Sequence, residues 1–151
     1  MIRIENDPEF WTKIASHPEV KSALFGLSLE EFRQFLLSDR ITPLADEHGG
    51  FIFIDSGGTG CVSEFHTLFT PEGWGREVTL AAHEAVKWIF NTNVRLLITY
   101  EQLENPRSKP PRSFGFTPHG DFVDSLIGPL RIWSLGIDSW LLSPVYRRLN
   151  K

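Results

Sequence analysis

The segment CVSEFHTLF-TPEGWG-REVTLAAHEAVKWIF-NTN-VRLLITY, residues Cys61–Tyr100, decides the fold of this chain. It predicts a strand, a glycine turn, a long helix and a second strand, in that order. Asn91–Asn93 ends the helix, and the apolar, β-branched run Val94–Tyr100 indicates a buried strand. Strands joined by a crossover helix are normally parallel, so the segment is a βαβ unit. Within the helix, apolar residues recur at steps of three and four, as one buried face requires: Val78, Ala81, Ala82, Ala85, Val86, Ile89 and Phe90.

The turn that enters this helix suggests an anion site. Gly73 and Gly75 flank Trp74 just before the first helical turn, where backbone N–H groups are free and glycine leaves them accessible. Together with the positive end of the helix dipole, these donors suit a phosphate or pyrophosphate, and Arg76 could add a positive charge. On the glycines alone, a tight strand-to-helix turn is the simpler interpretation, because Gly-x-Gly is a weak motif.

The rest of the chain predicts one α+β domain, residues 1–151, with a mixed sheet. Two or three short helices come first, with Asp7 as a cap, a helical piece at Glu19–Phe25 and a capping box formed by Ser28 and Glu31. An antiparallel meander follows, and the βαβ unit adds its second strand in parallel. The expected elements are strands at Ile41–Ala45, Phe51–Asp55 and Cys61–Phe69 with a turn at Glu47–Gly50, a loop at Glu101–Pro111, an extended piece at Thr117–Leu126, a last strand at Leu130–Leu135, and a helix at Asp138–Leu149 interrupted at Pro144.

Composition narrows the class of protein. The chain has 151 residues, 41% of them hydrophobic, which supplies a real core, and its net charge of −4 argues against a general nucleic-acid binder. A mild basic cluster lies at Arg107–Arg112. The single cysteine, Cys61, excludes an intrachain disulfide framework, and the five histidines lack the spacing of a helical zinc site, so no metal is expected. With no signal peptide and no apolar run of spanning length, we expect a soluble cytoplasmic protein.

The order of elements from Phe51 to Leu149 resembles the GCN5-related N-acetyltransferase (GNAT) superfamily. That family carries the pattern Gln/Arg-x-x-Gly-x-Gly/Ala at the helix start, and here it falls on Thr70–Gly75, with Thr70 in place of Gln or Arg. The resemblance also rests on Asn105, Gly115–Phe116 and the tail that begins at Gly136-Ile137-Asp138. It implies an acyl-CoA N-acyltransferase fold, a twisted mixed sheet of about six to seven strands flanked by helices.

The resemblance further implies acetyl-CoA as co-substrate and an amine as acceptor. A bulge in Cys61–Phe69 would splay this strand from Val94–Tyr100, and the pantetheine arm would enter the gap. Glu64 and His66 share one strand face, and either would act as general base, with Tyr100 either as a substitute acid or as an aromatic residue of the core or rim. The alternative is that the pair simply lies on a half-exposed sheet face. The residues expected to hold the coenzyme are Thr67, Leu68, Phe69, Gly73, Trp74, Gly75, Arg76 and Asn105.

The segment Asn105–Phe114 departs from the family pattern. It lacks the tyrosine that often protonates the leaving thiolate, and Pro110-Pro111 prevents a regular helix. A non-catalytic protein of the same fold is therefore the alternative. The pattern Glu-x-His before Pro and Gly resembles a subgroup of small phage-encoded acetyltransferase-like proteins, so this alternative would be a phage head-assembly or virion factor. Such a protein would sit in the host cytoplasm or the virion, as a homodimer or with a phage partner. The acceptor pocket is expected from the N-terminal helices and Asp121–Pro129.

Overall fold

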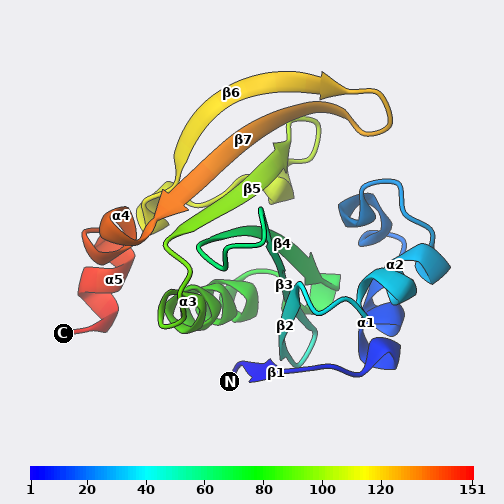
Figure 1. The fold of residues 1–151 in the computed structure, drawn as a ribbon, viewed down its shortest axis with the longest axis horizontal. Coiled ribbons are helices and arrows are strands. Elements are labelled where there is room, and N and C mark those ends of the chain that lie inside the picture. Colours follow the sequence, from blue (N-terminus) through cyan, green and yellow to red (C-terminus); the bar gives the residue numbers. More distant parts are fainter.

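A computed structural model describes residues 1–151. Its strands form one seven-stranded sheet in the order β1-β2-β3-β4-β5-β7-β6 (Figure 1). Every neighbouring pair of strands is antiparallel except β4 and β5, which are parallel and are joined by the crossover helix α3, Arg76–Phe90. The predicted mixed sheet and central βαβ unit are thus confirmed. The strands are β1 Arg3–Ile4, β2 Ile41–Asp46, β3 Gly49–Asp55, β4 Val62–Phe69, β5 Leu96–Gln102, β6 Thr117–Asp124 and β7 Gly128–Gly136.

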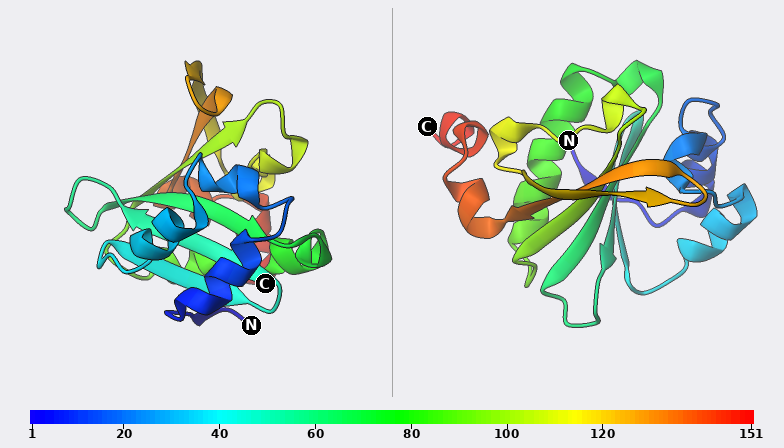
Figure 2. Two further views of the ribbon diagram at one scale, coloured as in Figure 1. Left: turned by 90° about the vertical axis from the view of Figure 1, so that its right-hand side faces the viewer. Right: turned by 90° about the horizontal axis from the view of Figure 1, so that it is seen from above.

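Helices cover both faces of the sheet (Figure 2). One face carries α1, Pro8–Ala15, and α2, Leu29–Phe35, which pack on side chains of β2, β3 and β4. The other face carries α3, with α4, Ile137–Leu141, beside it. The last helix, α5, Pro144–Leu149, follows a break at Ser143, as Pro144 predicts. None of these helices is long and apolar enough to cross a membrane.

The predicted helix caps are confirmed. Asp7 accepts a hydrogen bond from the N–H of Glu9 at the start of α1. Ser28 and Glu31 form the reciprocal capping box of α2, each side chain bonding the other residue's backbone N–H. These local bonds satisfy donors that the helix itself leaves free, which is why they are readable from sequence.

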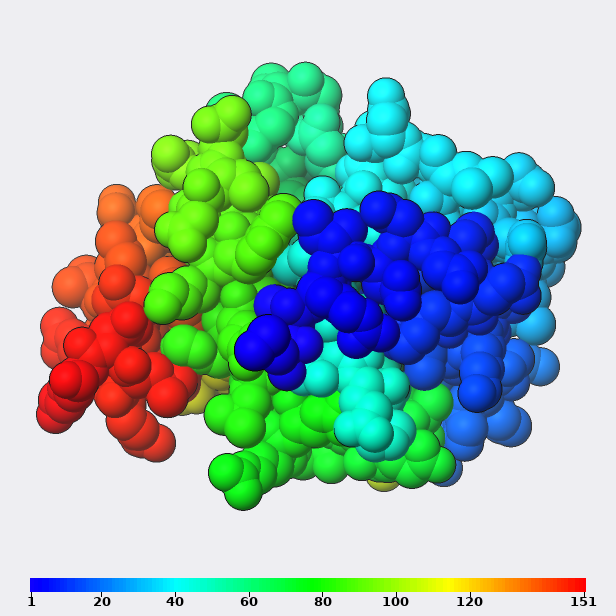
Figure 3. All heavy atoms as spheres, turned by 90° about the horizontal axis from the view of Figure 1, so that it is seen from below, coloured from blue at the N-terminus to red at the C-terminus, as the bar shows by residue number.

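Several element boundaries differ from the predictions. The expected helical piece Glu19–Phe25 contains only a 3₁₀ turn, Lys21–Leu24, and β5 starts at Leu96 instead of Val94. Gly49 and Gly50 belong to β3 instead of a turn, since they pair with both β2 and β4. Glycine is required there because the neighbouring backbones approach too closely for any Cβ. The short β1 was not predicted; it pairs with the edge of β2. The N–H of Ile2, just before β1, donates to the Glu84 carboxylate of α3. Figure 3 shows the face on which this N-terminal segment, in blue, lies.

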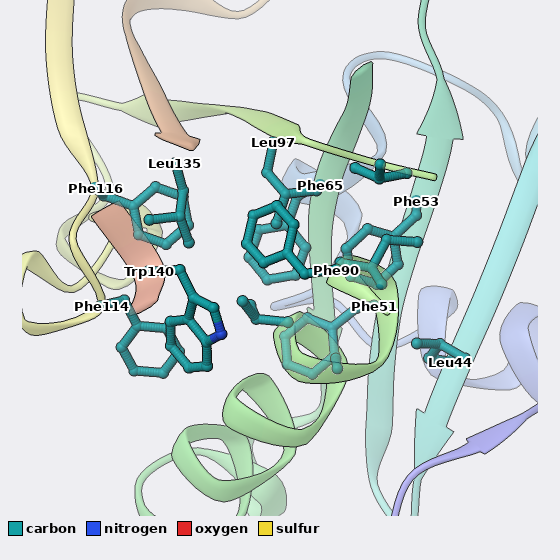
Figure 4. Close-up of a cluster of buried hydrophobic side chains, with 14 of the residues drawn as sticks. Leu44, Phe51, Phe53, Phe65, Phe90, Leu97, Phe114, Phe116, Leu135 and Trp140 are labelled. Atoms are coloured by element: carbon teal, nitrogen blue, oxygen red, sulfur yellow. The ribbon is translucent and has the colours of Figure 1, made fainter. Parts of the chain in front are cut away.

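The larger core lies between the sheet and α3 (Figure 4). Aromatic rings dominate it: Phe51 stacks on Phe65 at 5.1 Å between centroids, and Phe114 packs against Trp140 at 5.5 Å. Large rings fill the space between a sheet and a helix with few rotatable bonds, so they hold the two layers rigidly. The strand β4 and the start of α3, which frame the candidate site, are therefore fixed relative to each other.

Candidate functional site

A cleft opens where β4 and β5 separate. The two strands pair only from Val62 to Glu64 with Leu96–Ile98, and beyond this point β5 runs away from β4 toward β7 and β6 (Figure 1). The predicted splay is thus present, but the bulge expected in β4 is not. The pairing of β3 with β4 continues without a register shift along the whole strand, so the gap results from the course of β5 and not from an inserted residue.

Thr67 presents its backbone to this gap. Alternate residues of a strand direct their N–H and C=O groups to opposite neighbours, and the odd-numbered residues of β4 face β5. The carbonyl of Phe65 accepts a bond from the Thr99 hydroxyl at 2.7 Å, and that of Phe69 accepts one from the Trp74 indole at 3.2 Å. Thr67 lies between them and beyond the paired part of the strands. Its N–H and C=O are therefore placed to bond an extended ligand in the gap.

The two glycines before α3 serve different purposes. A Cβ on Gly73 would lie 2.6 Å from Phe69 and 3.1 Å from His48, so this glycine is required by packing, as the tight-turn interpretation holds. Gly75 is the N-cap residue with φ of 102°, open space around its Cα, and no side chain capping the helix. The first N–H groups of the fifteen-residue helix thus have no intrahelical or side-chain acceptor, and they form a positive, accessible end.

The cleft has a volume of about 920 Å³ and runs from this helix end, through the gap, to the face of the sheet that carries α1 and α2. Five of the predicted coenzyme residues line it: Thr67, Phe69, Trp74, Gly75 and Asn105. Three do not. Leu68 packs into the smaller core, on the face of the sheet that carries α1 and α2. Gly73 is buried beneath the turn, and the exposed Arg76 lies outside the lining of the cleft. Alternation along the strand, together with the compact turn, separates these residues from the cleft.

Arg107 closes one side of the cleft. Its guanidinium lies 5.6 Å from the centroid of the Trp74 ring and 2.9 Å from the Glu19 carboxylate, so it links the loop after β5 to the N-terminal segment. Asn105 accepts a bond from the backbone N–H of Arg107 at 3.1 Å and shapes this loop. The basic cluster at Arg107–Arg112 was the sequence signal for this side of the cleft. Its lining also includes the cations Lys109 and Arg148.

His66 and Tyr100 line the other end of the cleft, and Glu64 lies outside the lining, hydrogen-bonded to His66. Glu64 and His66 share the face of β4 that carries α1 and α2, as predicted, and Glu64 Oε2 lies 3.0 Å from His66 Nε2. The ring of Tyr100, on β5, stacks near that of His66 with centroids 6.5 Å apart. The hydrogen bond from His66 keeps the pKa of Glu64 below its ordinary value although burial opposes this. Burial and the Glu64 charge raise the pKa of Tyr100, so its hydroxyl stays protonated at neutral pH.

Two aromatic residues at this end were missed from the sequence. Phe25 lies edge-on to His66 at 5.2 Å, and Phe122 of β6 lies edge-on to Tyr100 at 6.3 Å. They come from the N-terminal segment and from Asp121–Pro129, the two regions expected to build an acceptor pocket, but no pattern singled out these side chains. Nowhere in the structure do three or more His, Cys, Asp or Glu side chains gather as they would to hold a metal ion.

Several solved structures with the same architecture are acetyltransferases. Spermidine N-acetyltransferase from Vibrio cholerae, in complex with CoA and spermine, has a TM-score of 0.70 at 17% identity, over 93% of this chain and 97% of that one. Aminoglycoside 6'-N-acetyltransferase complexed with coenzyme A gives 0.66 at 12%, over 91% and 97%. A probable acetyltransferase of the GNAT family from Chromobacterium violaceum gives 0.68 at 15%, over 92% and 88%. In sequence, no family model and no curated protein matches the chain.

These likenesses establish the fold. The chain has the GNAT acyl-CoA N-acyltransferase fold, with a seven-stranded mixed sheet and flanking helices, as the resemblance implied. At such low identity they do not fix the activity, which depends on the residues of the cleft. The phage subgroup and the non-catalytic assembly role receive no support from these comparisons and stay predictions, as does the homodimer.

Proposed function

We propose that this protein is an acyl-CoA-dependent N-acyltransferase that transfers the acetyl group of acetyl-CoA to an amine. The observation that carries the proposal is the continuity of the cleft. An uncapped helix end lies at one end of it, unpaired strand backbone lies in the middle, and His66, hydrogen-bonded to Glu64, and Tyr100 lie at the other end. The solved structures of the same fold that hold CoA are consistent with this reading.

The residues of the cleft suit the parts of acetyl-CoA. The free N–H groups that follow Gly75 would bind the pyrophosphate, and the cations Arg107, Lys109 and Arg148 line the same cleft. The backbone of Thr67 would bond the amide groups of the pantetheine arm, as a strand bonds its neighbour. A volume of about 920 Å³ lies near the top of the range of roughly 300–1,000 Å³ for small-molecule pockets, as so large a ligand needs.

His66 is the proposed general base. The Glu64 carboxylate is ionised and can only accept, so Nε2 of His66 donates to it and Nδ1 is left as the free acceptor of a neutral ring. His66 then takes a proton from the substrate ammonium, and Glu64 stabilises the imidazolium that forms. The freed nitrogen lone pair forms the N–C bond at the thioester carbonyl, the C–S bond breaks, and the Tyr100 hydroxyl donates a proton to the leaving thiolate. The nitrogen then loses its second proton, which restores the Tyr100 hydroxyl and leaves the neutral amide. A backbone N–H in the gap would stabilise the developing oxyanion.

Two measurements test this proposal. Isothermal titration with acetyl-CoA and with desulfo-CoA should give saturable binding, and release of the CoA thiol should depend on an added amine. His66→Ala should lower the rate of thiol release by about 100-fold or more with coenzyme affinity unchanged, since general-base catalysis contributes about that much. Absence of coenzyme binding at millimolar concentration, or equal rates for wild type and His66→Ala, would refute it.

A further inference from the structure

A second cavity adjoins the cleft on the face of the sheet that carries α1 and α2. It has a volume of about 230 Å³, and ten of its twelve lining residues are hydrophobic. The two cavities share the side chains of Ala23, Phe25, His66 and Tyr100, so they meet at the proposed base. Ile52, Ile54 and Leu68 form the strand side of this cavity, which we name the apolar cavity.

The apolar cavity offers one negative charge. Glu64 is its only carboxylate, and it lies at the side that faces His66. The lining of the larger cleft contains one carboxylate, Glu19, which forms an ion pair with Arg107 at 2.9 Å. An ammonium group entering this region therefore finds a single anionic partner. A second ammonium on the same substrate would be buried among hydrophobic side chains without a counter-charge, which costs several kcal/mol per ion.

Phe25 lines both cavities and forms part of the wall between them. It is the only residue other than glycine with a positive φ, at 52°, a conformation that a bulky side chain adopts only when its surroundings enforce it. This conformation places the ring edge-on to His66 at 5.2 Å and to Tyr100 at 6.4 Å. Aromatic rings at these distances suit an ammonium group where the two cavities meet and an apolar group in the apolar cavity beyond it.

The size of the apolar cavity limits the acceptor. At about 230 Å³ it is smaller than the roughly 300–1,000 Å³ of pockets that hold drug-sized ligands, so it accommodates a compact group such as one aromatic ring. The structurally similar acetyltransferases that are named for spermidine and aminoglycosides act on substrates with several amines. The present cavity lacks the additional carboxylates that such polycations require.

We propose that the acceptor is a small primary monoamine with one compact apolar group, of the arylalkylamine class, whose nitrogen lies beside the hydrogen-bonded Glu64–His66 pair and whose apolar group fills the apolar cavity. This inference rests on the proposed acetyl transfer. The product is a neutral amide and CoA thiol. The ammonium loses two protons on the way: His66 takes the first before the N–C bond forms and passes it to solvent, and the second leaves the nitrogen after the N–C bond forms and balances the proton that Tyr100 gives to the sulfur as the C–S bond breaks. Loss of the positive charge removes the attraction to Glu64 and favours release of the product.

The test compares 2-phenylethylamine, spermidine and kanamycin as acceptors at saturating acetyl-CoA, with release of the CoA thiol as the readout. Coenzyme binding is measured first by titration with desulfo-CoA. We expect kcat/KM for 2-phenylethylamine to exceed that for either polycation by about 100-fold or more, because a buried unpaired charge rejects the competitor. Ile54→Phe, next to Glu64 in the strand register, should raise the KM for 2-phenylethylamine about ten-fold without changing coenzyme affinity.

Ile41→Phe is the matched control, because Ile41 pairs with Ile54 on the next strand and is half-buried but lines neither cavity; it should leave both constants unchanged. Failure of coenzyme binding would refute the proposed function itself. Normal coenzyme binding with spermidine or kanamycin as the better acceptor would overturn only the inference about the amine. So would failure of 2-phenylethylamine to bind the complex with desulfo-CoA, a result that does not depend on any variant folding.

Discussion

Gly75→Glu should abolish tight coenzyme binding through charge. Gly75 is exposed and caps the accessible end of α3, so a carboxylate there lies among the N–H groups that bind the pyrophosphate. A like charge about 5 Å away in an effective dielectric of about 20 costs about 3 kcal/mol. Because water and salt screen an exposed site, we expect about 2 kcal/mol of this to remain, a loss of affinity of about 30-fold. Titration with acetyl-CoA measures it.

The strain of the substitution must be separated from its charge. Gly75 has φ of 102°, so any side chain costs about 1–3 kcal/mol of stability even though a Cβ meets no atom there. Gly75→Gln carries the same strain and bulk without the charge, and both variants should unfold at similar urea concentrations. If Gly75→Glu and Gly75→Gln bind acetyl-CoA within about three-fold of each other, the anion site at this helix end is refuted.

Three further predictions concern the framework of the site. The hydrogen bond that the His48 ring donates to the Glu77 carboxylate, at 2.7 Å, raises the pKa of His48 above its ordinary value of 6.5. The pair therefore stabilises the fold fully below about pH 6.5 and loses this effect as pH rises through the folded-state pKa, so Glu77→Gln should destabilise more at about pH 5.5 than at about pH 9. Trp133→Phe leaves the buried Glu101 without its indole donor at 3.0 Å and should cost about 2–4 kcal/mol in urea unfolding. Leu97→Ala, at a fully buried position, should cost about 2–5 kcal/mol.

Each of these has an outcome that contradicts it. A destabilisation by Glu77→Gln that is the same at both pH values would show that His48 charging is not involved. Adding Glu101→Leu to Trp133→Phe should recover part of the lost stability, since the buried carboxylate that has lost its indole donor is removed; no recovery would mean that the volume change alone is responsible. A cost below about 1 kcal/mol for Leu97→Ala would show that this core position repacks.

Most of the architecture could be predicted because its signals are local. The helix α3 follows from side chains three and four residues apart, the cap of α2 follows from Ser28 and Glu31, and the parallel pairing of β4 with β5 follows from the length of the crossover. The shared face of Glu64 and His66 follows from strand alternation. Each of these rests on the period of one element, which a sequence displays directly.

The bulge failed as a prediction because it was carried over from the family and not from a pattern in this chain. The register of β4 against β3 is uninterrupted, and the gap depends on where β5 goes after Ile98. That course is set by its pairing with β7, a contact between segments far apart in the chain. Three predicted coenzyme residues, Leu68, Gly73 and Arg76, lie outside the cleft for a similar reason, since a motif marks a stretch and not the direction of each side chain.

The sequence by itself determined the class of fold, the glycine turn before the long helix, and the strand face on which Glu64 and His66 meet. Only the tertiary structure decided what surrounds that pair. Phe25 and Phe122 reach it from distant parts of the chain, and the apolar cavity beneath Phe25 is closed by the 3₁₀ turn Lys21–Leu24 and by α2, whose sequences do not indicate a cavity. The reason is physical: periodicity and capping depend on neighbours in sequence, whereas a cavity is the space left when distant segments pack.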